Sequence, residues 1–245
     1  VLLLSPFLLS WARGTPYRRG DGRSIGLMVL AEPCLYFMFE AYALRYTTAS
    51  QAGIITSLLP LLVGVGAFFF LKEKLGLKAW LGFALAVGGV TTLTVFSENS
   101  EQAPNALLGN SLELCAMLMA CIYTLCVRKL AGYQPFFISA MQSAAGVFFF
   151  GLMIVLLSAP LPSSLPPVEA VAALGFLAFS TLVAYGMYNF GIARLSAGQA
   201  AAWINLIPVI TLFMGMLLLN ESLTLVQGLA VIPIILGVIL SQLPR

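Results

Sequence analysis

The stretch Thr48–Leu75, TASQAGIITSLLPLLVGVGAFFFLKEKL, decides the fold. A hydroxyl residue precedes a predominantly apolar run, and Thr48 followed three positions later by Gln51 has the pattern of a helix-start capping box. The run from Ala52 to Leu71 has about the ~20 residues that an α-helix needs to cross a hydrocarbon core. Because backbone groups in lipid must bond within their own segment, the stretch predicts a membrane-spanning helix.

Further segments of this kind fill the chain. Hydrophobic residues make up 60% of the 245 positions and charged residues 9%, against roughly 45–50% and 25% in soluble domains. Lipid must therefore surround most of the protein, and we predict an all-α membrane protein, a polytopic helical bundle. The eight predicted spans are Ile25–Leu44, Ala52–Leu71, Ala79–Phe96, Leu108–Val127, Phe136–Leu157, Val168–Phe190, Gln199–Leu219 and Leu225–Leu243.

The deciding stretch has a second copy, SAGQAAAWINLIPVITLFMGMLLLNESL, at 196–223. One shift of 148 residues aligns Pro60 with Pro208, and it also aligns Gly89 with Gly237. Five helices separate the starts of the two copies, so they run in opposite senses through the membrane. Inverted repeats of this kind form many secondary transporters, with the solute near the midplane.

The repeat unit needs five helices, which defines the predicted domains. Residues 1–97 form a first repeat of a helix tail plus three spans, 98–107 an inter-repeat loop, and 108–245 a second repeat of five spans. The run Val1–Trp11 is too short for a span, and the chain begins without methionine. We expect a ten-helix plan of which the first helix and most of the second are missing here.

Basic residues gather on one side of the predicted bundle. With alternating helices, all Lys and Arg residues except Arg45 fall on the side of the C-terminus. The positive-inside rule then places that side in the cytoplasm, in a plasma membrane of the bacterial inner-membrane type. The basic residues sit in short gaps between apolar runs, so the net charge of +3 does not indicate nucleic acid. The four cysteines lie inside apolar runs, which predicts reduced core residues.

The residues of both copies resemble the EamA-type repeat of the drug/metabolite transporter superfamily. In the first copy the resemblance rests on ALRYTTAS at 43–50, Leu59-Pro60, LKEKL at 71–75 and Gly88-Gly89. In the second copy it rests on AGQA at 197–200, LIP at 206–208, NESL at 220–223 and Gly237. The resemblance covers nearly all the chain. It implies a ten-helix transporter of two inverted halves that exports metabolites, amino acids or drugs, with the first helix helping to line a central cavity.

Three acids inside the spans are candidates for solute binding, since ionisable residues in a bilayer are costly and usually face a cavity. Glu32, Tyr36 and Glu40 follow at i, i+4 and i+8, so we expect them to share one helix face. Their alternative role is hydrogen bonding as neutral acids to a neighbouring helix. Glu113 begins the fourth span, where Asn110 and Glu113 also have the spacing of a capping box. Glu40 and Glu113 lie about 22 Å and 8 Å along their helices, at a similar predicted depth.

Other polar residues of the spans complete the candidate solute site. Tyr185 and Asn189 share a face, and Asn205 precedes Pro208 and aligns with Ser57 of the first copy. Their alternative role is interhelical hydrogen bonding. Met117 lies one turn beyond Glu113, and its alternative role is packing in the hydrophobic core. The predicted substrate-binding residues are Glu32, Tyr36, Glu40, Ser57, Glu113, Met117, Tyr185, Asn189, Trp203 and Asn205.

A secondary transporter is the leading function, with an intramembrane enzyme and a non-transporting scaffold protein as the alternatives. The chain has no histidine, and its one aspartate, Asp21, lies in a predicted loop, which disfavours catalysis; we predict no enzyme, metal or cofactor. Phosphorylated solutes need fixed positive charge, which the spans lack. Carboxylates with aromatic rings suit a neutral, zwitterionic or cationic metabolite. The predicted partners are this small molecule and the lipid bilayer, with no nucleic acid, and a homodimer is left open.

Overall fold

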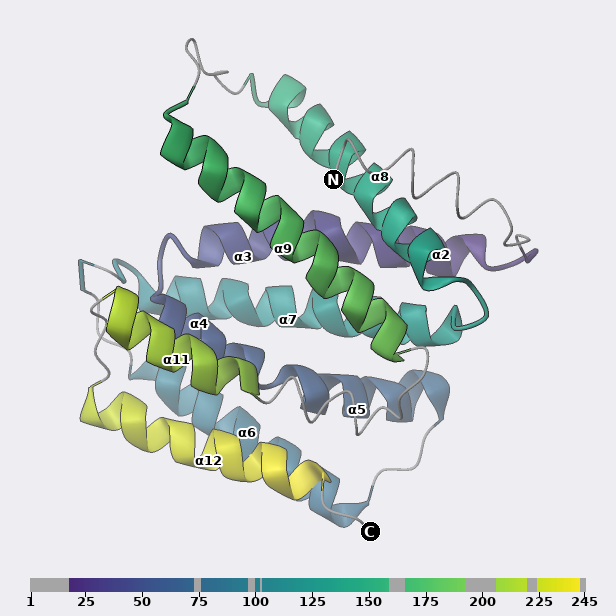
Figure 1. The fold of residues 1–245 in the computed structure, drawn as a ribbon. Coiled ribbons are helices and arrows are strands. Elements are labelled where there is room, and N and C mark those ends of the chain that lie inside the picture. The colour runs from purple at the N-terminus through teal and green to yellow at the C-terminus, as the bar shows by residue number, and fades with distance from the viewer. Residues whose placement is uncertain are drawn as a thin grey trace. The chain divides into compact units, whose positions relative to one another are not determined.

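The computed structural model describes residues 18–72, 76–96, 100–101, 103–158, 166–192, 206–219 and 224–242 (Figure 1). Every regular element in these ranges is a helix, which confirms the predicted all-α fold. In the described residues, five helical stretches are long and apolar enough to cross a membrane: Gly22–Ala43, Ala49–Phe70, Ala106–Lys129, Phe137–Leu156 and Val168–Gly191.

The first predicted span is present but interrupted. It consists of α2 (Gly22–Val29), the π-helical turn η1 (Leu30–Leu35) and α3 (Tyr36–Ala43), and Glu32 has the extended angles φ −145° and ψ 121°. The cause is Pro33, because a proline disfavours the helical conformation of the residue before it. The prediction of one continuous face through Glu32, Tyr36 and Glu40 is therefore wrong, since regular helix joins only the last two.

The second predicted span is also divided. It forms α4 (Ala49–Thr56) and α5 (Leu59–Leu71), with Pro60 in the first turn of α5, where its missing N–H leaves no bond unmade. Thr48 caps α4, and its hydroxyl accepts a hydrogen bond from the Gln51 backbone amide at 3.2 Å. This contact confirms the predicted cap of the first copy, whereas the corresponding residues 196–199 lie outside the described part.

The other six predicted segments are helical wherever the structure describes them. They are α6 (Leu77–Val95), α7 (Ala106–Lys129), α8 (Pro135–Leu156), α9 (Val168–Ile192), α11 (Leu206–Leu218) and α12 (Leu225–Gln242). The beginning of the seventh segment, with the candidates Trp203 and Asn205, lies outside the described residues.

The helices form two compact units, and each unit takes residues from both sequence repeats. The first unit comprises Val1–Cys34 and Cys126–Leu195, and the second comprises Leu35–Leu125 and Ser196–Arg245. In the first unit α8 packs against α2 and α9. In the second, α12 packs along α6 and α11 against α4 (Figure 1).

The contacts between α6 and α12 are reciprocal: the residues that Gly89 meets on α12 and those that Gly237 meets on α6 are related by the shift of 148 residues. A Cβ atom added to Gly89 would lie 2.6 Å from Ile234 Cγ1 and 2.9 Å from the Ala230 carbonyl oxygen. A Cβ atom added to Gly237 would meet the corresponding residues of the other copy, Gly82 and Ala86. The later part of each helix thus faces the earlier part of the other, so the two equivalent helices are antiparallel, as inverted repeats require.

The second unit has a hydrophobic core to which α4, α5, α6, α7 and α12 contribute. Its members include Ile55, Leu93, Met117 and Ile234, each at most 1% exposed. Large apolar side chains also cover the outer surface of the spans, for example Phe70 and Phe176. Such an apolar exterior is what a lipid-facing helix needs.

Candidate functional site

Helix α7 carries Glu113, the most deeply buried acid among the described residues of the second unit. The helix begins at Ala106, and the Asn105 side-chain oxygen accepts a hydrogen bond from the Leu108 backbone amide at 3.1 Å. Asn105 is therefore the cap, and the capping-box interpretation of Asn110 and Glu113 is wrong, because both residues lie beyond the first turn. Glu113 has no capping role, and its position inside the helix needs another explanation.

Asn110 belongs to a buried polar network that sequence reasoning missed. The Thr47 hydroxyl donates to Asn110 Oδ1 at 2.6 Å, and Asn110 Nδ2 donates to Gln51 Oε1 at 2.9 Å. All three side chains are at most 3% exposed. The network joins the start of α4 to α7. Gln51 was assigned to a cap only, and nothing in the sequence indicated its partner 59 positions away.

Glu113 lies one turn further along α7. Its side chain is 1% exposed, and its Oε1 atom is 3.4 Å from the Thr56 hydroxyl. Its other carboxyl oxygen, Oε2, is buried without a hydrogen-bond partner. An unpartnered buried polar atom is costly, so such an atom in a native protein needs an explanation.

Glu40 is the second acid of this cluster. The Tyr36 hydroxyl donates to Glu40 Oε1 at 2.7 Å, one helical turn apart on α3. The Glu40 and Glu113 carboxyl groups are near enough to interact electrostatically. Each of the two acids has a hydroxyl group as a neighbour, Tyr36 for Glu40 and Thr56 for Glu113.

The first unit contains a separate polar cluster on three elements. The Tyr185 hydroxyl of α9 donates a hydrogen bond to Glu32 Oε1. One turn further along α9, Asn189 Nδ2 donates to Ser139 Oγ at 3.1 Å and to Gln142 Oε1 at 3.3 Å. Glu32 is 4% and Asn189 2% exposed. Ser139 and Gln142 were not predicted, although their i, i+3 spacing on an otherwise apolar helix was visible in the sequence.

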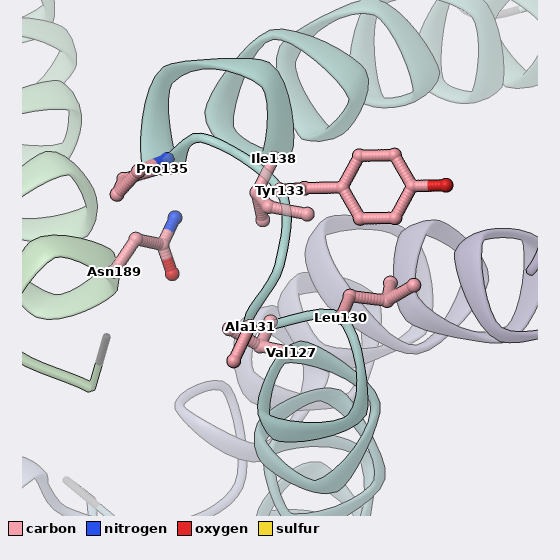
Figure 2. A pocket seen from close by; sticks show the side chains of 7 residues that line it. All are labelled: Val127, Leu130, Ala131, Tyr133, Pro135, Ile138 and Asn189. Atoms are coloured by element: carbon pink, nitrogen blue, oxygen red, sulfur yellow. The ribbon is translucent and has the colours of Figure 1, made fainter. Parts of the chain in front are cut away.

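A small pocket adjoins this second cluster (Figure 2). It is lined by apolar residues between Val127 and Ile138 and by Asn189, which enters from α9 opposite Pro135. The Tyr133 ring points away from Asn189, and its hydroxyl accepts a hydrogen bond from the Arg18 backbone amide at 2.8 Å. Asn189 is the one polar side chain in this lining with its functional group directed at the pocket.

Core packing and a hydrogen bond within one helix account for two further candidates, Met117 and Ser57. Met117 is 1% exposed in the hydrophobic core of the second unit, which favours the packing role left open for it. The Ser57 hydroxyl is buried and donates to the Ile54 carbonyl oxygen of its own helix at 2.6 Å. The four cysteines carry free thiols, and two of them, Cys34 and Cys121, are buried as the prediction of core residues requires. No group of three metal-ligating side chains occurs in the part of the chain that the structure describes.

Comparison with known families identifies the architecture. A family model described as the EamA-like transporter family matches residues 1–95 and 107–243. The chain belongs to the EamA-like transporter family. This membership confirms the resemblance to the drug/metabolite transporter superfamily, and together with the apolar helices it makes the chain a multi-pass membrane protein.

Individual relatives of this EamA-family chain are named transporters. It is 28% identical to the uncharacterized transporter YetK of Bacillus subtilis over 86% of the chain and 65% of that protein. It is 30% identical to the uncharacterized transporter YcxC of the same organism, over 97% of the chain and 78% of that protein. The probable amino-acid metabolite efflux pump of Escherichia coli is 31% identical over 72% of the chain and 61% of that protein.

A solved crystal structure has the same fold. It matches 98% of this chain and 84% of its own length with a TM-score of 0.65 and 18% sequence identity. The chain thus spans about two thirds of the length of YetK and more of the crystallised relative.

Proposed function

We propose that this protein is a secondary transporter that carries a small neutral, zwitterionic or cationic metabolite across the membrane, in the direction of export. The observation that carries the proposal is the burial of polar and acidic clusters inside the spans of an EamA-family chain. Glu113, at 1% exposure with an unpartnered oxygen, is the strongest example. Ionisable groups at such positions are expensive and typically line a solute or ion pathway.

The charge of the described spans supports this substrate class. Every Lys and Arg in the described helices occupies a first or last turn: Arg23, Lys78, Arg128 and Lys129. A phosphorylated or strongly anionic solute would find no fixed cation within the described part of the spans. The acids Glu32, Glu40 and Glu113 suit an ammonium group instead. The name of the Escherichia coli relative, an amino-acid metabolite efflux pump, points to the same class.

We assign a binding role to one cluster in each unit. In the second unit the assigned residues are Glu40, Glu113 and Tyr36. In the first they are Glu32, Tyr185 and Asn189, with the pocket of Figure 2 beside Asn189. Met117 and Ser57 are left out of the assignment, because core packing and a bond within the helix account for them.

The intramembrane enzyme and the scaffold protein are weaker alternatives. The chain has no histidine to act as a general base. The connections in the described part are short, for example 130–134 between α7 and α8, which gives a scaffold little loop surface for partners.

We propose that the C-terminus and the basic loops face the cytoplasm of a bacterial cell, following the positive-inside rule. In a cysteine-free background, Ser100→Cys is expected to react from outside with a membrane-impermeant thiol reagent in intact cells. Gly76→Cys is expected to react only after the cells are opened. Labelling of the Gly76→Cys protein from outside in intact cells would contradict the proposed topology.

Transport in proteoliposomes tests the function. Vesicles containing the purified protein are loaded with radiolabelled basic, neutral and acidic amino acids and with a simple amine, and efflux is followed. We expect efflux of cationic or zwitterionic compounds and none of the acidic ones. A folded, lipid-inserted protein that moves no member of the panel would count against the proposal.

A matched pair of variants on α7 locates the site. Glu113→Gln keeps the size of the side chain and removes its charge. The loss of a charge-assisted contact of about 1.5–3 kcal/mol lowers cargo affinity roughly tenfold to a hundredfold. Ser111→Ala is the control, since this exposed hydroxyl only donates to the Leu107 carbonyl oxygen of its own helix. Equal affinities of the two variants would remove Glu113 from the binding site.

A further inference from the structure

The Glu113 carboxyl group lies where none of the described residues would compensate for a permanent negative charge. One oxygen has the Thr56 hydroxyl at 3.4 Å, a long contact, and the other has no partner. That same hydroxyl also lies 3.0 Å from the Ala52 carbonyl oxygen of its own helix. The single hydroxyl proton cannot serve both oxygens, so Glu113 has at best a shared donor.

Among the described residues of the second unit, no cation compensates for the Glu113 charge. The groups that act electrostatically or by hydrogen bonding on Glu113 are Glu40 and Thr56. In the described residues, α4, α5, α11 and α12 contain no Asp, Glu, Lys, Arg, Tyr or Cys, and α6 contains only Lys78, in its first turn. The remaining titratable groups in described residues of the unit are Tyr36, Glu40, Tyr42, Arg45, Tyr46, Lys72, Glu101, Cys115, Cys121 and Tyr123.

Arg45, the cation that follows α3 in the sequence, has another partner. The Arg45 guanidinium carbon lies 5.8 Å from the centre of the Tyr42 ring, a cation–π distance. Two ionised carboxylates, one of them 1% exposed, would therefore repel each other, and none of the described cations acts on Glu113. Such a pair cannot keep both charges in a low-dielectric interior.

We propose that Glu113 and Glu40 form a proton-binding site, in which Glu113 carries an exchangeable proton and Glu40 is its ionised neighbour. The two acids differ in their donors, and this difference decides the assignment. Glu40 Oε1 receives the Tyr36 hydroxyl proton at 2.7 Å, whereas Glu113 Oε2 receives none. A proton on Glu113 turns the unpartnered acceptor into a donor and removes one of the two negative charges.

The site then couples the proton to the cargo, a step that rests on the proposed function. When an ammonium group arrives, the Glu113 O–H bond breaks and the proton passes to water. The carboxylate that remains takes the positive charge of the cargo as its counter-charge. The cluster gains one positive charge and loses one, so its net charge is the same before and after. In an apolar environment this exchange avoids the cost of an uncompensated charge in either state.

Infrared spectroscopy of the protein in lipid nanodiscs tests the proton site without reference to transport. The wild-type protein is expected to show a carboxylic-acid C=O band at neutral pH that disappears reversibly in alkaline buffer. Glu113→Gln is expected to abolish this band, Glu113→Asp to restore it at an altered frequency, and Glu40→Gln to shift it. Glu169→Gln is the matched control at the exposed first turn of α9, and it is expected to leave the band unchanged.

Absence of the band from the wild-type protein at neutral pH would overturn the proposal. So would its persistence in Glu113→Gln or its removal by Glu32→Gln instead. Thermal melts of each variant separate loss of the proton from loss of the fold, and Glu113→Asp keeps the test decisive if the glutamine variant does not fold.

Proton release tests the coupling. Addition of a transported amine to the protein in weakly buffered solution with a pH-sensitive dye is expected to release about one proton per bound cation. The release is expected to vanish in Glu113→Gln. Binding of the cation without release by the wild-type protein would overturn the exchange. Failure of every compound to bind, with the infrared band present, would instead contradict the proposed function and leave the proton site intact.

Discussion

Substitution of Gly237 by alanine tests the contact between the two equivalent helices α6 and α12. The added Cβ would meet the Gly82 carbonyl oxygen and would lie 2.8 Å from the Ala86 backbone nitrogen. Carbon atoms in ordinary contact are about 3.5–4.0 Å apart. Because both neighbours are backbone atoms, no side chain can rotate away, and the helices must separate by about 1 Å.

The magnitude follows from two opposing terms. Overpacking of this kind costs about 1–3 kcal/mol, and the rigid neighbours place Gly237→Ala near the upper end. Alanine favours a helix over glycine by about 1 kcal/mol, which leaves a net loss of about 2 kcal/mol. For a chain of this size that corresponds to a melting temperature lower by roughly 4–8 °C.

Melting of the purified protein in a fixed detergent measures the effect. Gly228→Ala is the control on the same helix, because a Cβ atom there has nothing within 4 Å, and we expect an unchanged or higher melting temperature. Gly89→Ala, the counterpart of Gly237→Ala in the first copy, is expected to destabilise as well. A Gly237→Ala protein as stable as Gly228→Ala would refute the close antiparallel contact.

Three further substitutions test the interior of the units. Asn110→Ala leaves Gln51 without its amide donor and is expected to cost about 2–3 kcal/mol, more than the roughly 1 kcal/mol of removing the α7 cap by Asn105→Ala; equal melting temperatures would contradict the network. Met117→Leu conserves volume, so we expect a loss below about 1.5 kcal/mol and unchanged cargo affinity, and a changed affinity would return Met117 to the binding site. Tyr185→Phe removes a donor from a buried carboxyl group, with an expected cost of about 1–3 kcal/mol, measured by thermal melts; an unaltered melting temperature would show that this hydrogen bond contributes nothing.

The helical type and the approximate positions of the described segments could be predicted because both depend on local sequence. Apolar length locates a span wherever lipid is the solvent, and Thr48 caps its helix by a contact three residues away. The sequence also indicates that Gly89 and Gly237 occupy equivalent positions, because a shift of 148 residues aligns them. Their reciprocal packing in the structure agrees with this equivalence.

The polar contacts could not be predicted in the same way. Pro33 was visible, but the sequence does not show that Glu32 leaves the helical conformation, because prolines inside membrane helices are also tolerated with milder kinks. The partners of Gln51 and Asn189 lie 59 and 47–50 residues away, and single-sequence spacing contains no such information. Asn110 satisfied a capping pattern by chance, and only the observed start of α7 at Ala106 excluded it.

The two copies differ where chemistry is expected. The shift of 148 residues pairs the glycines of α6 and α12 with each other, so helix packing is symmetric. The same shift pairs Glu32 with Ser180 and Glu40 with Tyr188, neither of which is an acid. If these glutamates served helix packing alone, the equivalent span would need equivalent groups, because it fills the equivalent place in an inverted repeat. Glu32 and Glu40 thus have no acidic counterpart at this shift, which agrees with the binding role proposed for them toward one asymmetric solute.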